Sequence, residues 1–432
     1  MNISHPSVAV AVLTLCLSAS AQLAEPRQVV VLHAAHMLDV SASRILSPAE
    51  ILITGDRITA VGEHVTHPAG AQVIDLGPRT LMPGLIDAHV HLFLHPGAED
   101  LQTVQESVPE RTLIAANAAA ADLMAGFTAE RDMGTEGAGS ADSAVRDAID
   151  SGMIPGPRMR MSGMAIDILG GHEDAIHYNP AQHVLSNADY ANSAEEIVAA
   201  MRAQRKEGAD FTKIYETGRD SLANGEFHTP FQYTADELKA AVAESKRINP
   251  APGHGVAVHA TGEPGTGYAV NAGVESVDHA YLLSDATMAG MKTKGIYAVP
   301  TFAIAEYFAD HAANKARETS EREQIAFHIA QFKRQLAAGV PMAVGSDVGP
   351  FPHGTQAREL VLMQQNGMLT ADVLRADLLN GAKLLGWEGE IGELKPGFRA
   401  DVIALDGDPL ADISATTRVR FVMKGGVVFR RP

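Results

Sequence analysis

Short apolar runs alternate with helical segments from residue 82 to residue 390, and this alternation limits the folds open to the chain. For example, a helical pattern over residues 194–206 precedes an apolar run at 211–215, and one over residues 234–247 precedes another at 256–259. Strands that alternate with helices are typical of parallel α/β folds. We therefore predict a (β/α)8 TIM-like barrel. A doubly wound open sheet is the alternative, although the sequence contains no glycine-rich dinucleotide fingerprint to support it.

Both ends of the chain have an all-β pattern instead. Short apolar runs separated by turn residues fill residues 29–76, and the same character returns at residues 401–429. Each end alone is too small to bury a core. We therefore predict one small β-sandwich domain, formed by residues 22–81 together with 391–432, and a catalytic barrel formed by residues 82–390.

The N-terminus has the features of an export signal. An apolar run at residues 8–17 is too short to span a bilayer, and Ala19-Ser20-Ala21 supplies the small residues that a signal peptidase needs. We predict a signal peptide over residues 1–21 and an exported protein, periplasmic or secreted. A disordered or cytosolic N-terminus is the alternative, because no Lys or Arg precedes the apolar run.

Composition excludes several kinds of site and partner. The only cysteine, Cys16, lies in the predicted signal, so the mature chain would have no disulfide and no thiolate metal ligand. The net charge of −18 argues against a nucleic-acid partner. No later stretch is long and apolar enough to cross a membrane. Any metal must therefore be held by nitrogen and oxygen ligands.

Two histidines two residues apart form the first candidate metal site. His89 and His91 lie at the end of an apolar run, and residues two apart on a strand point to the same side. Lys213 lies inside another apolar run, where a charged ammonium is costly unless it is paired or chemically altered. It could be a lysine that carries a carbamate, or a lysine whose ammonium reaches solvent at a strand end.

Three further polar residues close apolar runs in the same way: His259, His279 and Asp347. Each lies at the carboxyl end of an expected strand, which is the face on which parallel barrels build their active sites. The order His-x-His, Lys, His, His, Asp is therefore difficult to explain as chance.

This pattern resembles the amidohydrolase superfamily over nearly the whole mature chain. Residues 81–91, Leu-Met-Pro-Gly-Leu-Ile-Asp-Ala-His-Val-His, are similar to the family's entry into its first barrel strand, and residues 395–402 to its return to the small β domain. Among subgroups, the chain is similar to prolidase-like members, including dipeptidases and ochratoxin-hydrolysing amidases. Imidazolonepropionases and cytosine-deaminase-like members usually carry no lysine at the position of Lys213, which counts against them.

The resemblance implies a two-metal site. His89, His91 and Asp347 would hold the first metal, His259 and His279 the second, and carboxylated Lys213 would bridge them. Ligands of this kind suit zinc, although manganese or cobalt could substitute. Relatives of this kind commonly form homo-oligomers, often octamers, so we expect more than a monomer.

The resemblance also implies a reaction. Two such ions activate a shared water, and the bridging hydroxide attacks an amide carbonyl next to a free carboxylate. Asp347 is the candidate base and later the acid. His172 is a candidate substrate or oxyanion contact, or else a solvated loop histidine. Tyr215 and Arg219 are candidate partners of the substrate carboxylate, and a solvated loop cation is the alternative for Arg219.

Two further histidines and two other functions complete the expectations. His353 is expected to line the mouth of the site, and His254 to lie at the opposite end of the barrel.

The substrate could be a dipeptide, an N-acyl amino acid or ochratoxin A. Hydrolysis of a lactone or cyclic amide by the same residues is the alternative, as is a binding protein that has lost its chemistry.

Overall fold

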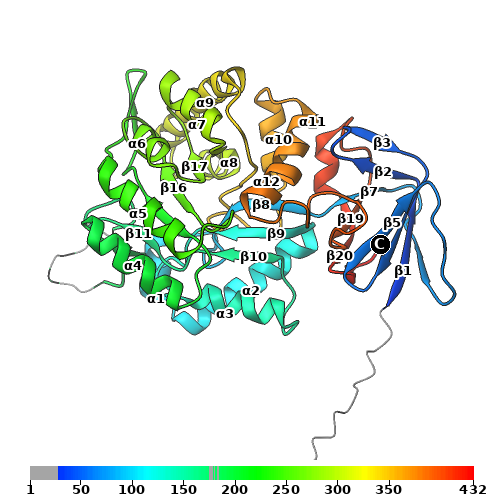
Figure 1. The fold of residues 1–432 in the computed structure, drawn as a ribbon. Helices are drawn as coiled ribbons and strands as arrows, with labels where there is room; N and C mark the ends of the chain where they lie inside the picture. Colours follow the sequence, from blue (N-terminus) through cyan, green and yellow to red (C-terminus); the bar gives the residue numbers. More distant parts are fainter. Residues whose placement is uncertain (1–27, 175–178, 180, 182–183) are drawn as a thin grey trace, which may run out of the picture.

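The computed structural model describes residues 28–174, 179, 181 and 184–432. The predicted signal peptide therefore lies outside the described residues. Figure 1 shows a large α/β part and, beside it, a smaller β part in which the blue N-terminal strands lie next to the red C-terminal strands. None of the helices in these residues is long and apolar enough to cross a membrane.

The smaller part contains two sheets. One sheet has the order β5-β4-β1-β6, and the other has the order β21-β20-β19-β7-β2-β3, so strands from both ends of the chain share it. β7 pairs antiparallel with β19, which joins residues more than three hundred positions apart. The strands are β1 (Val29–Ala34), β2 (His36–Asp39), β3 (Arg44–Leu46), β4 (Ala49–Thr54), β5 (Arg57–Gly62), β6 (Gln72–Asp75), β7 (Thr80–Pro83), β19 (Val402–Leu405), β20 (Val419–Lys424) and β21 (Val427–Arg430).

The two sheets share an apolar core. Leu32, Ile51 and Leu81 from the N-terminal strands pack with Val402 and Phe421 from the C-terminal strands, and all five are fully buried. Burial of this kind stabilises a fold by about 1.5–3 kcal/mol for each large side chain. Neither end could bury these side chains without the other.

The larger part is built on parallel strands that the chain visits in order. β8, β9 and β10 form one sheet, and β11, β13, β16, β17 and β18 run through a second sheet, with β12 at its edge. Every pairing among them is parallel. The strands are β8 (Leu85–Val90), β9 (Phe127–Asp132), β10 (Arg158–Met161), β11 (Ala165–Asp167), β12 (Ala188–Tyr190), β13 (Thr212–Tyr215), β16 (Val256–Ala260), β17 (Ser276–His279) and β18 (Tyr297–Val299).

Two irregular segments lie between these sheets. β10 and β11 are consecutive in the chain and are separated only by residues 162–164; β10 pairs with β9, whereas β11 pairs with β13. Residues 341–348 run between β18 and β8, with parallel bridges from Ala298 to Met342 and from Val90 to Val348. This second segment brings Asp347 beside the end of β8, where its amide donates to the carbonyl of His89.

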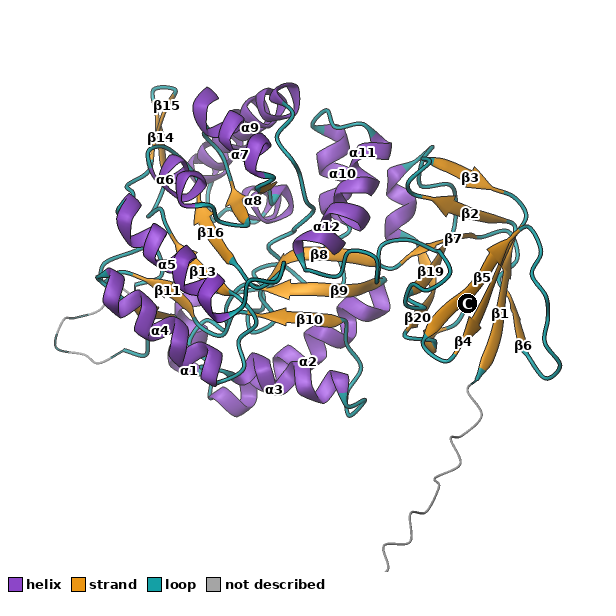
Figure 2. Cartoon of the chain, viewed as in Figure 1, coloured by secondary structure: helices purple, strands orange, loops and turns teal. Residues whose placement is uncertain are grey.

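Helices cover the parallel strands (Figure 2). They are α1 (Glu99–Gln105), α2 (Val108–Ala125), α3 (Ala141–Asp150), α4 (Ala194–Lys206), α5 (Ala235–Ile248), α6 (Gly265–Ala272), α7 (Asp285–Lys294), α8 (Phe302–Asp310), α9 (Lys315–Ala338), α10 (Arg358–Gln365), α11 (Thr370–Arg375) and α12 (Gly381–Leu384). The expected helices at 194–206 and 234–247 correspond to α4 and α5. α5 begins at a full capping box, in which Thr234 and Glu237 satisfy each other's backbone amides.

One hairpin was not expected from the sequence. β14 (Ser221–Ala223) and β15 (Glu226–His228) pair antiparallel after β13. Asn224 and Gly225 form its turn, with φ values of 53° and 80°, the left-handed conformation that a tight hairpin turn requires. The hairpin projects beside α6 and α9 at the end of the parallel strands (Figure 2).

Candidate metal centre

Three ligand atoms converge where β8 ends. Nε2 of His89 lies 3.2 Å from Nε2 of His91, and each of these nitrogens lies 3.3 Å from Oδ1 of Asp347. Both histidines are buried, at 1% and 5% exposure. Their alternation on a strand turns both rings to one side, and residues 341–348 bring the carboxylate to meet them.

This triangle has the dimensions of a metal site. A tetrahedral zinc ion with ligands at about 2.0–2.1 Å separates neighbouring ligand atoms by about 3.3–3.4 Å. The three observed edges are within about 0.2 Å of that spacing. Two imidazoles and a carboxylate are also a donor set that zinc accepts. The residues therefore fit a metal ion of this kind.

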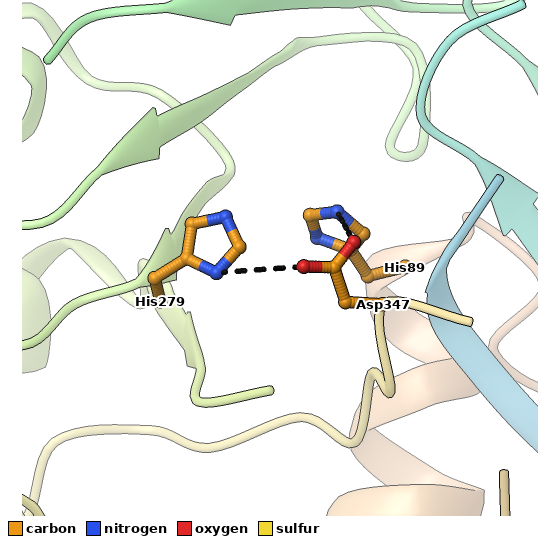
Figure 3. Close-up of side chains that lie close together, drawn as sticks. All are labelled: His89, His279 and Asp347. Atoms are coloured by element: carbon orange, nitrogen blue, oxygen red, sulfur yellow. Dashed lines mark ion pairs between the residues drawn. The ribbon is translucent and has the colours of Figure 1, made fainter. Parts of the chain in front are cut away.

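His279 approaches the triangle from β17. Nδ1 of His279 lies 4.0 Å from Oδ2 of Asp347, and His89, His279 and Asp347 form one group of possible ligands (Figure 3). The same Nδ1 lies 2.7 Å from Oγ1 of Thr301, which leaves Nε2 of His279 to bind a metal. The ring of His259, from β16, lies 4.4 Å from that of His279, and Nε2 of His259 is buried without a hydrogen-bond partner among the described residues.

Lys213 lies on β13 beneath these histidines. It is 1% exposed, and its Nζ lies 3.3 Å from Oδ2 of Asp278 and 5.3 Å from the ring centre of Tyr215. Asp278 is itself fully buried, with Arg131 at 3.5 Å and Nδ1 of His89 at 3.6 Å. Asp278 therefore connects the lysine to His89.

The backbone at the site is strained. His279, Asp347 and Glu136 have φ values of 69°, 62° and 48°, in the left-handed region that side chains other than glycine rarely adopt. Thr301, which contacts His279, has a φ of 54°. Each such residue costs about 1–3 kcal/mol and persists only where the surrounding structure imposes it, most often at functional sites.

Burial and neighbouring charges set the protonation states. Burial lowers the pKa of His89 to about 4, and burial also lowers the pKa values of His259 and His279. Burial alone would raise the pKa of Asp347, but the surrounding histidines hold it well below its usual range. Neutral imidazoles and an ionised carboxylate are the forms that bind a metal ion.

His91 differs from the other histidines because of a second carboxylate. Its Nδ1 lies 3.1 Å from Oε1 of Glu136, which is 3% exposed. Burial alone would lower the pKa of His91, but Asp347 and Glu136 raise it. Sequence reasoning missed Glu136, because it follows β9 in a loop, Gly134-Thr135-Glu136-Gly137, with no apolar run to mark its position.

One cavity of about 130 Å³ brings together eight of the predicted residues. They are His89, His91, His172, Lys213, Tyr215, His259, His279 and Asp347. The ring of His172 lies 4.1 Å from that of His259 and stacks on Tyr215 at 5.1 Å. Burial lowers the pKa of His172 to about 4 and raises the pKa of Tyr215, so both are neutral near neutral pH.

A larger cavity of about 510 Å³ adjoins the first. It shares His172, His259, His279 and Asp347 with it and adds Arg219 and residues of α8 and α9. Arg219 is exposed, and no ion pair to it occurs among the described residues. The site therefore opens to solvent on the side of Arg219.

The expectation that His353 lines the mouth of the site is wrong. His353 is outside both cavities; its Nδ1 lies 2.7 Å from Asp122, and its Nε2 lies 3.3 Å from the carbonyl of His91. His353 is half-buried, and it supplies the hydrogen-bond partner that the fully buried carboxylate of Asp122 needs. His254 precedes β16 and contacts the carbonyl of Asp210, away from both cavities, as expected.

Comparison with known proteins gives a consistent result. The chain is 30% identical to ochratoxinase of Aspergillus niger over 384 residues, which cover 82% of this chain and 76% of that protein. The crystal structure of that ochratoxinase matches with a TM-score of 0.79 at 27% identity, covering 94% of this chain and 97% of that chain.

Two further structures are similar. A Xaa-Pro dipeptidase with methionine bound in its active site has a TM-score of 0.83 at 30% identity, covering 93% of this chain and all of that chain. A prolidase in complex with N-methylphosphonate-L-proline has a TM-score of 0.83 at 27% identity, covering 94% of this chain and all of that chain. The model of the amidohydrolase family matches residues 80–429. This chain therefore belongs to the amidohydrolase family.

Proposed function

We propose that this amidohydrolase cleaves the amide bond of a dipeptide or an N-acyl amino acid whose carboxylate is free. The observation that carries the proposal is the cavity in which His89, His91 and Asp347 meet at ligand distances, with His259, His279 and Lys213 in the same wall. The names ochratoxinase, Xaa-Pro dipeptidase and prolidase among its relatives support hydrolysis of an amide or peptide bond. Ochratoxin A is accordingly one candidate substrate.

His89, His91 and Asp347 would hold one metal, and His259 and His279 a second, with zinc as the ion that suits them best. When bound, two such ions would activate a water and polarise the amide carbonyl. Asp347, at the centre of the histidines, would take a proton from that water and return it to the leaving nitrogen. Tyr215 and His172, both neutral, would donate hydrogen bonds to the substrate or to its developing oxyanion.

Lys213 would bridge the two metals as a carbamate. Once deprotonated, Nζ would add to carbon dioxide, forming one N–C bond and releasing one proton, so that the side chain ends in a carboxylate. Between two cations an unmodified ammonium would be repelled and poorly solvated, whereas a carbamate is attracted to both. The complete burial of Nζ beside the ligands supports this assignment.

We also propose the architecture and the setting of the enzyme. The bridges made by residues 341–348 support closure of the parallel strands into an eight-stranded barrel over residues 82–390, next to a β-sandwich of residues 22–81 and 391–432.

The apolar run at residues 8–17 and Ala19-Ser20-Ala21 support a cleaved signal peptide and export. N-terminal sequencing of protein from its native host would reveal residues before Ala21 if this is wrong. We expect a homo-oligomer, which sedimentation at micromolar concentration tests.

The test of the function is a matched substrate panel with metal analysis. Zinc-loaded protein should hydrolyse dipeptides and N-acyl amino acids, and the rate should fall when the same compounds carry an amidated carboxylate. Arg219→Gln should raise KM for the free acids without a change for the amidated ones, because the exposed guanidinium is free to pair with a carboxylate.

Two results would favour the other functions. Faster turnover of lactones or cyclic amides than of any free acid would favour the lactone hydrolase. A metal content near zero together with no turnover would favour a binding protein that has lost its chemistry.

A further inference from the structure

Aromatic rings form a continuous series, two members of which, Tyr281 and His328, line the larger cavity. Phe327 stacks on Phe227 at 5.2 Å, Phe227 lies 6.0 Å from Tyr281, Tyr281 lies 4.3 Å from His328, and His328 stacks on Phe302 at 4.2 Å. Only 5% of the chain is Phe, Trp or Tyr, so four such residues in one row are a local concentration. The rings come from the hairpin, from the segment after β17, and from α8 and α9.

Tyr281 is the member of this series that faces the reaction site. It lines the larger cavity, and its ring lies 6.1 Å from that of His279. Burial raises the pKa of its hydroxyl, so the side chain is neutral. Beside it, Ile304, Phe308 and Ile325 add apolar surface to the cavity, whose lining from α9 also includes the polar side chains Glu321 and Gln324. The Tyr281 ring and these aliphatic and aromatic side chains therefore offer an apolar patch to a substrate held at His279.

His328 packs against the ring of Tyr281 and lines the same cavity. It is 2% exposed, and both ring nitrogens are buried without a hydrogen-bond partner among the described residues. Burial lowers the pKa of His328 to about 3, with the nearby main chain of His279 only partly opposing this. A neutral imidazole without hydrogen bonds acts as a flat ring, and its place between Tyr281 and Phe302 fixes the ring of Tyr281.

The position of Arg219 decides which end of the substrate meets this wall. A carboxylate is best placed at the exposed rim, where it stays partly hydrated while it pairs with the guanidinium. An apolar group gains most from the buried wall, where Ile304 is 5% exposed. With its carboxylate at Arg219, the substrate would therefore turn its acyl group toward Tyr281.

We propose that Tyr281 determines acyl-group specificity and selects planar aromatic acyl groups over small aliphatic ones, with His328 as the positioning residue for its ring. This inference rests on the proposed hydrolysis of N-acyl amino acids. It predicts that N-benzoyl-L-phenylalanine is hydrolysed with a higher kcat/KM than N-acetyl-L-phenylalanine.

The experiment measures the ratio of these two kcat/KM values in four variants of the zinc-loaded enzyme. Tyr281→Leu should lower the benzoyl-to-acetyl ratio by about tenfold, because ring stacking and planar contact are lost. Tyr281→Phe should keep the ratio, because the ring and not the hydroxyl makes the contact. His328→Ala should lower the ratio, and His328→Phe should restore it, because a phenyl ring can replace an imidazole whose nitrogens make no hydrogen bonds.

Phe231→Leu is the matched control, since Phe231 is exposed, packs on Tyr268 and lines neither cavity at the metal centre. It should leave the ratio unchanged. Metal content is measured in every variant because Tyr281 lies two residues from His279. An equal loss of both activities in Tyr281→Leu would overturn the proposal. A change in kcat/KM that depends on the amino-acid side chain, when the acyl group is held fixed, would also overturn it.

Failure of the proposed function has a different signature. If the wild type hydrolyses no N-acyl amino acid, the function is wrong, and calorimetric titration with N-benzoylglycine and N-acetylglycine then decides the inference. Tighter binding of the benzoyl compound that is lost in Tyr281→Leu supports it, and equal binding of the two compounds overturns it.

Discussion

Oε1 of Glu136 lies 3.1 Å from Nδ1 of His91, on the side of the imidazole opposite to the nitrogen that faces Asp347. The two atoms make a charge contact and not a hydrogen bond. A carboxylate in this position favours a proton on Nδ1, which leaves Nε2 to bind a metal. The main chain of Glu136 is held in turn, because its carbonyl accepts hydrogen bonds from Arg111 and Thr103. The strained φ of Glu136 is the local cost of this placement.

Glu136→Gln should therefore weaken metal binding at the first site by about 10–100-fold, the usual effect of losing such a partner. The amide keeps the size of the side chain but removes the charge that orients His91. Competition with a chelator, followed by metal analysis, measures the change. Glu173→Gln is a useful comparison, because Glu173 lines the same cavity but is not among the residues in contact with His91. Equal metal affinity in Glu136→Gln and wild type would disprove the orienting role.

The second prediction concerns Lys213 and its proposed role as a bridge between two metals. Lys213→Arg should lose one metal per chain and at least about a hundredfold in kcat, because a guanidinium stays charged and cannot form a carbamate. Lys213→Ala should lose metal as well, and a short carboxylic acid at high concentration should restore part of its activity by occupying the space of the bridge. Metal content and turnover are measured together. Two metals and normal turnover in Lys213→Arg would show that the bridge is wrong.

The third prediction concerns the packing behind His89. A Cβ on Gly345 would lie 2.8 Å from Cβ of His89 and would also overlap Val299. Gly345→Ala should therefore displace His89, reduce metal binding and destabilise the fold by about 1–3 kcal/mol, as overpacking of a core usually does. Thermal unfolding with and without zinc measures both effects. Gly70→Ala serves as the control, since it adds backbone strain at a φ of 81° but meets no neighbouring atom.

The fourth prediction concerns Glu244, which lies outside the metal centre, and its effect on how the stability of the fold depends on pH. Hydrogen bonds from Arg247 and Arg202 lower the pKa of Glu244 to about 2. A carboxylate with a lowered pKa in the folded state stabilises the fold above its unfolded pKa, and this contribution is lost as pH falls toward the folded pKa. Because both arginines are largely exposed, the contribution is about 1 kcal/mol or less.

Glu244→Gln should consequently lower the unfolding temperature at pH 6. The difference from wild type should shrink by about half near pH 3.5, because the unfolded carboxyl is then mostly protonated. Thermal unfolding of both proteins across this range measures the trend. A difference that stays constant down to pH 3.5 would show that Glu244 contributes through packing and not through its charge.

The sequence alone determined the elements and most of the candidate ligands. Apolar runs that alternate with helices predict parallel strands. The polar residue that closes each run is then predicted to lie at the carboxyl end of its strand, where the active site of such a fold is built. His89, His91, His259, His279 and Asp347 could be found in this way because each occupies a position that periodicity defines. The pairing of the two chain ends followed from the same reasoning, since neither end could bury its apolar side chains alone.

Only the tertiary structure decided the contacts that periodicity does not mark. Glu136 reaches His91 from a loop, and Asp278 meets Lys213 although the two are 65 residues apart. His353 has the sequence neighbourhood of a site residue, yet it turns inward to pair with Asp122. Tyr281 and His328 meet on a cavity wall that is assembled from separate segments. Such contacts depend on how loops and helices pack over the strands, and a local pattern carries no information about distances across a packed core.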